Sequence, residues 1–370
     1  MTNRAIAHAR LRASRLLGGD ASLPSAVDVV RWFGAVQSQD VPGAMWAVAQ
    51  RMPLGTTLED VGAAFDAGAI VRTHAMRPTW HFLAPDELRW IQELTGPRVR
   101  QANAAINKRA LGFPEEDFRT AERILRAELR GGRVRTREEF RAPWTAAGIE
   151  IREPIAMAYL AMEAELLAII CSGPRRGRQA TTYALVDERI PPTPPRERDD
   201  ALRDLTIRYF TSHGPALVRD MSWWSGLTIA DVRHGVELAG DVLERRTIDD
   251  LEYVAPVGGF EPADVPVPFV RLLSNYDEYL GSYVDYSPIQ DPALPKARNV
   301  ADVLGAHIVV RDGFVVGGWR RALGPKAVTV TVTLLLPLDA AERAALAEEA
   351  EAFGRFFGLR AELTVRADRA

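Results

Sequence analysis

The feature that most constrains the fold of this chain is an order of predicted elements, three helices followed by two strands, that occurs three times. In the first copy, Ser22 and Pro24 fit the cap and first position of a helix that stops near Gln37, and Thr57 and Asp60 fit a capping box. The helices of this copy are predicted over residues 1–17, 22–37 and 57–65, and its strands over residues 70–73 and 80–83.

The second and third copies repeat this order with other residues. The second has predicted helices over 118–129, from Thr136 onward and over 154–168, and strands over 167–171 and 181–186. A proline-rich linker, residues 190–195, leads to the third, with helices over 199–211, 215–224 and 228–240 and strands over 242–246 and 253–257. Only the order of the predicted elements is repeated, because the copies share little sequence.

Three helices followed by a hairpin are typical of a winged-helix unit. Beyond Pro266 the sequence becomes β-rich, with strands predicted over 306–311, 314–321, 328–336 and 361–365 and a helix over 340–357. We therefore predict an α+β chain of three tandem winged-helix units followed by a small C-terminal β-barrel. The predicted divisions are residues 1–112, 113–190, 198–262 and 263–370.

Composition excludes several classes of protein. With 47% hydrophobic and 26% charged residues, the chain is in the globular range, and no apolar run approaches the roughly 18 residues of a membrane span. Its single cysteine, Cys171, forms neither an internal disulfide nor a thiolate-rich metal site. A reducing cytoplasm is the expected compartment.

The net charge of −3 conceals an asymmetry along the chain. Residues 1–178 hold 25 basic and 20 acidic residues, whereas the remainder holds 21 and 29. Only three of the 46 basic residues are lysines, and arginine has a planar fork that suits phosphate oxygens. A GC-rich genome also explains an arginine-rich composition, so arginine usage alone identifies no partner.

Winged-helix units favour DNA as the partner, since one helix of such a unit enters a groove of the duplex. Protein partners remain an alternative, because the pI of about 6.1 is far below that of a simple DNA-binding domain. The sequence contains no phosphate-binding or dinucleotide-binding loop, no His-Glu-x-x-His and no nucleophile elbow. Its six histidines are scattered, so neither a metal nor a cofactor is predicted.

One polar motif, Gln37-Ser38-Gln39-Asp40, precedes a Pro-Gly breaker. If the helix has ended at Gln37, an extended chain directs both glutamine amides to the same side. Amides both donate and accept hydrogen bonds, so two of them can hold a water molecule without titrating. By itself, the motif is equally consistent with solvated polar residues at a helix end.

Four segments together resemble the bacterial winged-helix DNA glycosylases of the AlkZ and YcaQ-like family, over nearly the whole chain. They are the Gln-x-Gln motif and residues 72–82, 275–280 and 317–321. The Gln-x-Gln form resembles the AlkZ branch. The resemblance implies a monomeric, cofactor-free glycosylase that acts on double-stranded DNA in the nucleoid, with Gln37 and Gln39 as catalytic residues.

The reaction that this resemblance implies is hydrolysis of N7-alkylpurine nucleotides and unhooking of azinomycin-type interstrand crosslinks, which gives drug self-resistance through base excision repair. A lysine nucleophile is not expected, so the enzyme is predicted to be monofunctional. The main alternative is a non-enzymatic winged-helix transcription regulator, and a more distant one is a scaffold for protein partners.

Candidate DNA contacts lie at three places in the sequence. A turn in the second unit carries Arg175, Arg176 and Arg178, and we predict that they contact phosphates. Arg77 and His81 lie in the first segment that carries the resemblance, and the Arg311–Phe314 turn is a candidate probing hairpin with Arg311 as a DNA contact.

Overall fold

The computed structural model, which describes residues 1–177, 181–294 and 307–367, has three segments in which helices are followed by a strand pair, but the first segment also contains a helix over 41–49 and a short strand over 36–37 that were not predicted. The first segment contains α2 (Ala26–Phe33), α3 (Val41–Ala49), α4 (Leu58–Ala67), β2 (Val71–Ala75) and β3 (Thr79–Leu83). The second contains α6 (Glu115–Leu129), α7 (Arg141–Ala146), α8 (Pro154–Leu166), β4 (Ile170–Ser172) and β5 (Tyr183–Leu185). The third contains α10 (Arg198–His213), α11 (Val218–Ser225), α12 (Ile229–Ala239), β7 (Leu243–Ile248) and β8 (Leu251–Pro256).

The helix predicted to stop near Gln37 ends four residues earlier, at Phe33. Gly34 has φ +83°, a backbone conformation that glycine adopts without steric cost, and its N–H bonds to the carbonyl of Val30. The chain then forms a short strand, β1 (Val36–Gln37), which pairs antiparallel with β3 so that Gln37 lies opposite His81. Gln37 is therefore in a sheet of order β1-β3-β2 and not at a helix end.

Further elements connect these segments. The longest is α5 (Leu88–Ile106), a helix of 19 residues that the sequence analysis did not predict. It contains Gly96 and Pro97, a pair that argues against a helix in sequence. The shorter elements are α1 (Asn3–Ala13), α9 (Val186–Arg189), β6 (Ala216–Leu217) and α13 (Glu278–Gly281). None of the helices described is long and apolar enough to cross a membrane.

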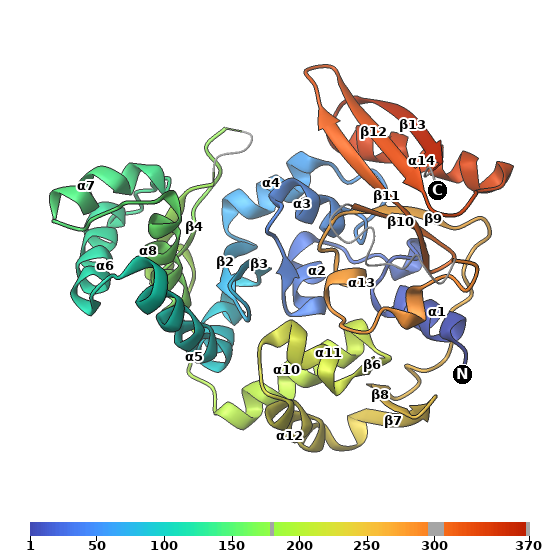
Figure 1. Ribbon diagram of the computed structural model, residues 1–370, viewed down its shortest axis with the longest axis horizontal. Helices are drawn as coiled ribbons and strands as arrows, with labels where there is room; N and C mark the ends of the chain where they lie inside the picture. The colour runs from blue at the N-terminus through green and yellow to red at the C-terminus, as the bar shows by residue number, and fades with distance from the viewer. Residues whose placement is uncertain (178–180, 295–306, 368–370) are drawn as a thin grey trace.

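The C-terminal region forms a curled, half-barrel sheet of five strands in place of the predicted barrel. Its order is β13 (Arg360–Ala367), β12 (Ala327–Leu334), β11 (Phe314–Leu323), β10 (His307–Arg311) and β9 (Val270–Leu273). The helix α14 (Ala340–Phe356) crosses between β12 and β13, which are parallel, as a crossover connection requires. The β11–β12 hairpin projects from the body of the molecule (Figure 1).

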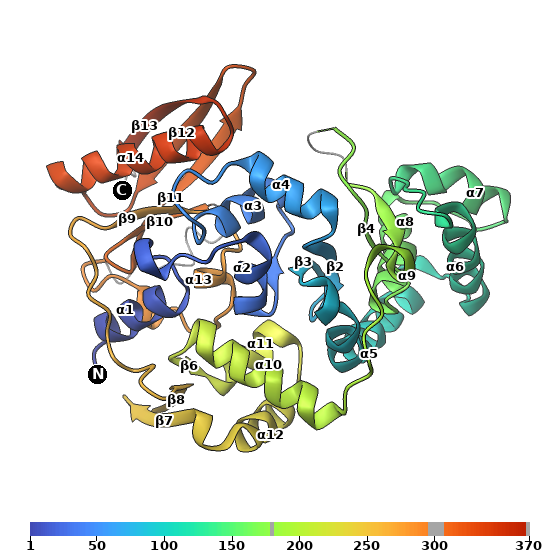
Figure 2. The same ribbon diagram turned by 180° about the vertical axis from the view of Figure 1, so that it is seen from behind.

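One hydrophobic core joins the first segment to the C-terminal sheet. It includes Phe33, Trp46, Phe82, Trp319 and Phe353, all at most 5% exposed. The third segment has another core, which it shares with β2 and α5. The lobe of α6, α7 and α8 has its own core and lies to one side of the rest, where it packs against α5 and β2 (Figure 2). These shared cores bring β1, α11 and α13 together.

Candidate active site

Gln37 is held at the edge of a cavity by contacts to its main chain and its side chain. Its backbone N–H donates to Glu278 Oε1 at 2.7 Å, and Arg77 Nη2 donates to its side-chain Oε1 at 3.3 Å. The side chain is buried, yet it contributes to the wall of a cavity of about 820 Å³. The position of this amide is therefore set before any ligand binds.

Aromatic and basic side chains line the rest of this cavity, which we call the Gln37 cavity. Its aromatic residues are Trp223, Tyr276 and Tyr286, and its arginines are Arg77, Arg98 and Arg219. The Arg77 guanidinium lies 4.9 Å from the centre of the Trp223 ring, which is about half exposed. Aromatic faces that stack bases and arginines that bind phosphates are a combination suited to nucleic acid.

Glu278 lies behind Gln37 as a buried carboxylate with several hydrogen-bond donors. Its Oε2 accepts from Trp224 Nε1 at 3.0 Å and from Ser282 Oγ at 2.5 Å, and it lies 3.2 Å from His213 Nε2. Burial acts to raise the pKa of Glu278, but the hydrogen bond and the charge of His213, together with the hydrogen bonds from Ser282 and Gln37, outweigh it and lower the pKa to about 2. The carboxylate is therefore ionised at neutral pH.

Gln39 lies beside a second cavity, of about 650 Å³, which we call the Gln39 cavity. Ser38, fully buried, separates the two glutamines, and its N–H donates to the carbonyl of Trp80 at 2.7 Å. Gln39 is exposed. Charged and apolar side chains from three parts of the chain line this cavity, among them Met45, Arg72, Arg175, Arg321 and Phe357.

Asp40 forms a two-point ion pair with Arg321 of β11, at 2.7 and 2.8 Å. Arg321 Nη1 also lies 2.9 Å from His307 Nε2. Burial and the neighbouring Arg321 lower the pKa of His307 to about 4, so its ring is neutral near pH 7, and its Nδ1 accepts from the N–H of Asn275 at 2.8 Å. Asp40 lines the Gln39 cavity, and Arg321 of the same cavity is its ion-pair partner.

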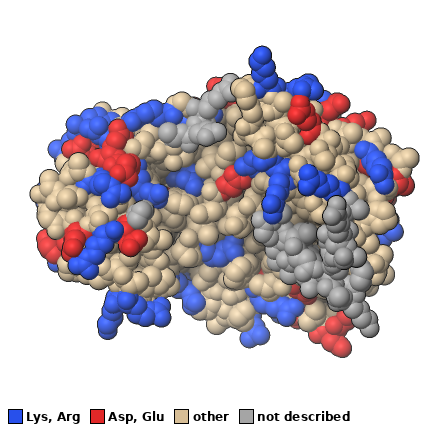
Figure 3. Space-filling view, turned by 45° about the horizontal axis from the view of Figure 1, so that its top comes forward, with Lys and Arg blue, Asp and Glu red and all other residues tan. Residues whose placement is uncertain are grey.

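The face shown in Figure 3 is hollowed between the lobe of the second segment and the rest of the molecule, and Lys and Arg side chains lie around and within this hollow. A model of the AlkZ-like DNA glycosylases matches residues 30–356. This chain belongs to that family of DNA glycosylases. No curated protein matches its sequence.

Among solved structures, this glycosylase has the fold of the DNA glycosylase AlkZ of Streptomyces sahachiroi. The two chains are 23% identical, the similarity covers 100% of each, and the TM-score is 0.77. Within the residues that the structure describes, no group of three or more His, Cys, Asp or Glu side chains is arranged to hold a metal ion.

Of the predicted DNA contacts in this glycosylase, Arg77 lies in the Gln37 cavity, whereas His81 does not reach a surface. His81 is fully buried, and burial lowers its pKa to about 3. Its role as a DNA contact stays a prediction. The neutral ring lies opposite Gln37 and within 3.0 Å of the carbonyl of Thr79.

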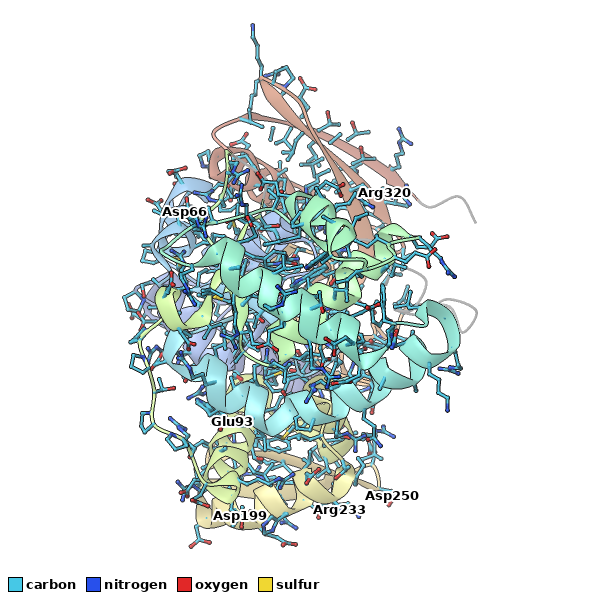
Figure 4. The ribbon with its side chains drawn as sticks, turned by 90° about the vertical axis from the view of Figure 1, so that its left-hand side faces the viewer. Asp66, Glu93, Asp199, Arg233, Asp250 and Arg320 are labelled. Atoms are coloured by element: carbon cyan, nitrogen blue, oxygen red, sulfur yellow. The ribbon has the colours of Figure 1, made fainter. Side chains whose placement is uncertain are left out.

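The arginines of the β4–β5 turn lie in ion pairs with other parts of the chain. Arg175 pairs with Asp66 of α4 at 2.7 Å, and Arg176 pairs with Glu139 at 2.8 Å. In the side view of Figure 4, Asp66 lies in the half of the molecule that holds Arg320, at the opposite end from Asp199. Arg178 is outside the described residues. The turn therefore also connects the second segment to the first.

The Arg311–Phe314 turn packs against the protein and is not a free hairpin. Arg311 pairs with Asp291 at 2.6 Å, and Asp312 lies 2.9 Å from His8 Nε2 of α1. The Tyr279 hydroxyl donates to the carbonyl of Gly313 at 2.7 Å. The projecting hairpin is the next one, between β11 and β12, whose tip at residues 324–326 is exposed.

Sequence reasoning missed the side chains that complete the Gln37 cavity. Glu278 and Tyr276 belong to the segment 275–280, which carried part of the resemblance, but no pattern indicated that this segment meets Gln37. Trp223 lies on α11, and the two adjacent tryptophans, Trp223 and Trp224, were the available signal in the sequence.

Proposed function

We propose that this glycosylase hydrolyses the N-glycosidic bond of N7-alkylated purines in double-stranded DNA, with Gln37 and Gln39 as its catalytic residues. The observation that carries the proposal is the Gln37 amide, prepositioned by Glu278 and Arg77 in a cavity of aromatic and arginine side chains. An N7-alkylated purine is cationic, so it leaves as a neutral base while positive charge develops on the sugar.

Such a reaction needs a placed water and stabilisation of the sugar more than it needs a strong acid. A glutamine carbonyl oxygen accepts a hydrogen bond from the water, and both amides present partial negative charge to the sugar. In the free protein, Arg77 donates a hydrogen bond to Gln37 Oε1. A DNA phosphate competes for Arg77 and releases that oxygen to the water.

The same contacts support a monofunctional hydrolase. A Schiff-base mechanism needs an amine at the reacting sugar, and no lysine lines either cavity within the described part of the chain. Three helix-and-hairpin segments around a hollow surface support three winged-helix units that hold one duplex, as a monomer and without a cofactor.

We further propose that the enzyme unhooks azinomycin-type crosslinks and thereby protects its host through base excision repair in the nucleoid. A crosslinked guanine is tied to the opposite strand and cannot be rotated fully out of the helix. Cavities of about 820 and 650 Å³ on either side of Ser38 leave room for a bulky adduct beside the two glutamines.

The test uses duplex DNA with a single N7-methylguanine and, in parallel, duplex DNA with one N7-linked crosslink. We expect abasic sites and separated strands with the wild-type protein, and loss of both products with Gln37→Ala and Gln39→Ala. Gln101→Ala, an exposed glutamine on α5, is the matched control. Tight binding to intact DNA without base release would contradict the proposal and favour a regulator.

A further inference from the structure

Glu278 differs from the other carboxylates near the two glutamines in what it is paired with. Asp40 is held by Arg321, and the adjacent Asp277 is held by Arg51 at 2.8 and 2.9 Å. The donors that reach Glu278 are instead the Gln37 N–H, an indole N–H and a hydroxyl, together with a histidine ring. Among these partners, only His213 opposes the charge of Glu278, and it does so when its ring is protonated.

The helix that carries Glu278 also forms the wall of the Gln37 cavity. Leu280 and Gly281 of α13 line the cavity, and a Cβ atom added to Gly281 would lie 3.5 Å from Gln37 Oε1. The backbone segments that carry the buried carboxylate and the reactive amide therefore lie next to each other in space, with no solvent-exposed segment between them. Glu278 is 2% exposed, so water screens its charge weakly.

We infer that Glu278 is a positioning residue for the proposed reaction, which fixes the Gln37 main chain and supplies negative potential where positive charge develops on the deoxyribose. The inference rests on the proposed function. In the bound substrate the positive charge is on the alkylated base, and it moves to the sugar as the glycosidic bond breaks. A fixed charge beside Gln37 therefore favours the transition state over the ground state.

Arg77 is the arginine that opposes this potential in the free protein. It lies close enough for Glu278 to counteract the effect of burial on its pKa. When Arg77 binds a DNA phosphate, its charge is neutralised there, and the Glu278 carboxylate remains as the formal charge behind the Gln37 amide.

A second buried carboxylate provides a matched control. Glu165 of α8 accepts from Trp80 Nε1 at 3.2 Å and lies 2.6 Å from His74 Nδ1, so it shares an indole and a histidine with the Glu278 arrangement. It is also buried, but its partners lie in β2 and β3 and do not include Gln37. Glu165→Gln thus makes the same change from carboxylate to amide at a residue that has no proposed role in the reaction.

The experiment compares binding to two DNA duplexes, one with a cationic pyrrolidine in place of the target sugar and one with neutral tetrahydrofuran. We expect the wild-type protein to prefer the cationic duplex by about tenfold or more, and Glu278→Gln to lose that preference. Glu278→Asp, which keeps the charge, and Glu165→Gln should retain it. A merely structural role for Glu278 would lower both affinities together and leave their ratio unchanged.

Base release from N7-methylguanine DNA provides the second readout. We expect Glu278→Gln to slow the single-turnover rate by about 100-fold while the Kd for the same DNA changes by about threefold or less. Rates and affinity ratios equal to those of Glu165→Gln would overturn the inference and leave the glycosylase assignment intact.

If Glu278→Gln melts at a lower temperature than the wild-type protein, the inference is tested on the wild-type protein alone. Equal affinities of the wild-type protein for the two duplexes would overturn the inference by themselves. A wild-type protein that releases no base would overturn the proposed function and this inference with it.

Discussion

Gln37 and Gln39 are two residues apart in the sequence, but the structure places them in different environments. Gln37 is 8% exposed, paired in a strand and bonded through both its main chain and its side chain. Gln39 is exposed and lies beside the other cavity. Alternation along an extended chain predicts that residues i and i+2 share a side, but it does not predict what each of them meets.

The difference indicates separate tasks for the two amides. A group that is fixed before binding loses little entropy at the transition state, whereas an exposed side chain must be ordered by its ligand. We therefore expect Gln37 to act mainly on the chemical step and Gln39 to act on both binding and chemistry.

The largest expected effect is on base release. Gln37→Ala should lower the single-turnover rate by about 10³-fold with nearly unchanged DNA affinity, and Gln39→Ala should lower it by about 10²-fold with weaker binding. Both rates are measured on DNA with one N7-methylguanine, and Kd is measured on the same DNA. Equal losses with equal affinities would contradict separate tasks.

The second-largest expected effect is a loss of protein stability on replacing an arginine beside the Gln39 cavity. Arg321→Ala leaves the half-buried Asp40 carboxylate without its two-point partner, so the free energy of unfolding should fall by about 2 kcal/mol. Urea denaturation measures the change. The exposed Arg320 on the same strand is the control, and Arg320→Ala should cost less than about 0.5 kcal/mol.

A smaller effect is expected on affinity at the Gln37 cavity. If Arg77 transfers from Gln37 to a phosphate, Arg77→Ala should weaken DNA binding by about threefold to tenfold. The slope of log K against log salt should also fall by about one. Arg233 on α12 is the control, and an Arg77→Ala protein with the wild-type salt slope would show that Arg77 binds no phosphate.

The smallest effect is on the pH dependence of stability. His307 has a pKa of about 4 in the folded protein, below its ordinary value of 6.5, so the unfolded chain takes up a proton first. Its contribution to stability is present above pH 6.5 and is lost as the pH falls towards 4. Between pH 6 and 5, His307→Asn should remove about 1 kcal/mol of the loss in unfolding free energy.

Urea denaturation of both proteins at the two pH values measures this difference. Identical losses in the wild-type protein and in His307→Asn would show that the pKa of His307 is not lowered in the folded protein. Glu278 contributes little to the loss in this window, because the unfolded chain takes up a proton at this residue only near its ordinary pKa of 4.5.

Elements with a local signal were predictable from the sequence. The capping boxes of Thr57 with Asp60 and of Thr228 with Asp231 are both formed, because each is a contact between residues three positions apart. The helix α5 was not predictable from pattern, since its Gly96 and Pro97 are tolerated only because both neighbouring lobes pack against it.

The candidate site was predictable only in part. The Gln-x-Gln motif and Arg77 could be named from the sequence. The burial of His81 and the packing of the Arg311–Phe314 turn against α1 could not, because both depend on elements distant in the chain.

The sequence by itself determined most of the helices and strands, the capping boxes of Thr57 and Thr228, and the Gln-x-Gln motif. Only the tertiary structure decided that Gln37 meets Glu278, 241 residues away, and that Gln39 lies beside Arg321 of the C-terminal sheet. The physical reason is that hydrogen bonds within a turn are set by nearest neighbours. A buried charge, in contrast, is stable only where packing of the whole chain brings its donors together.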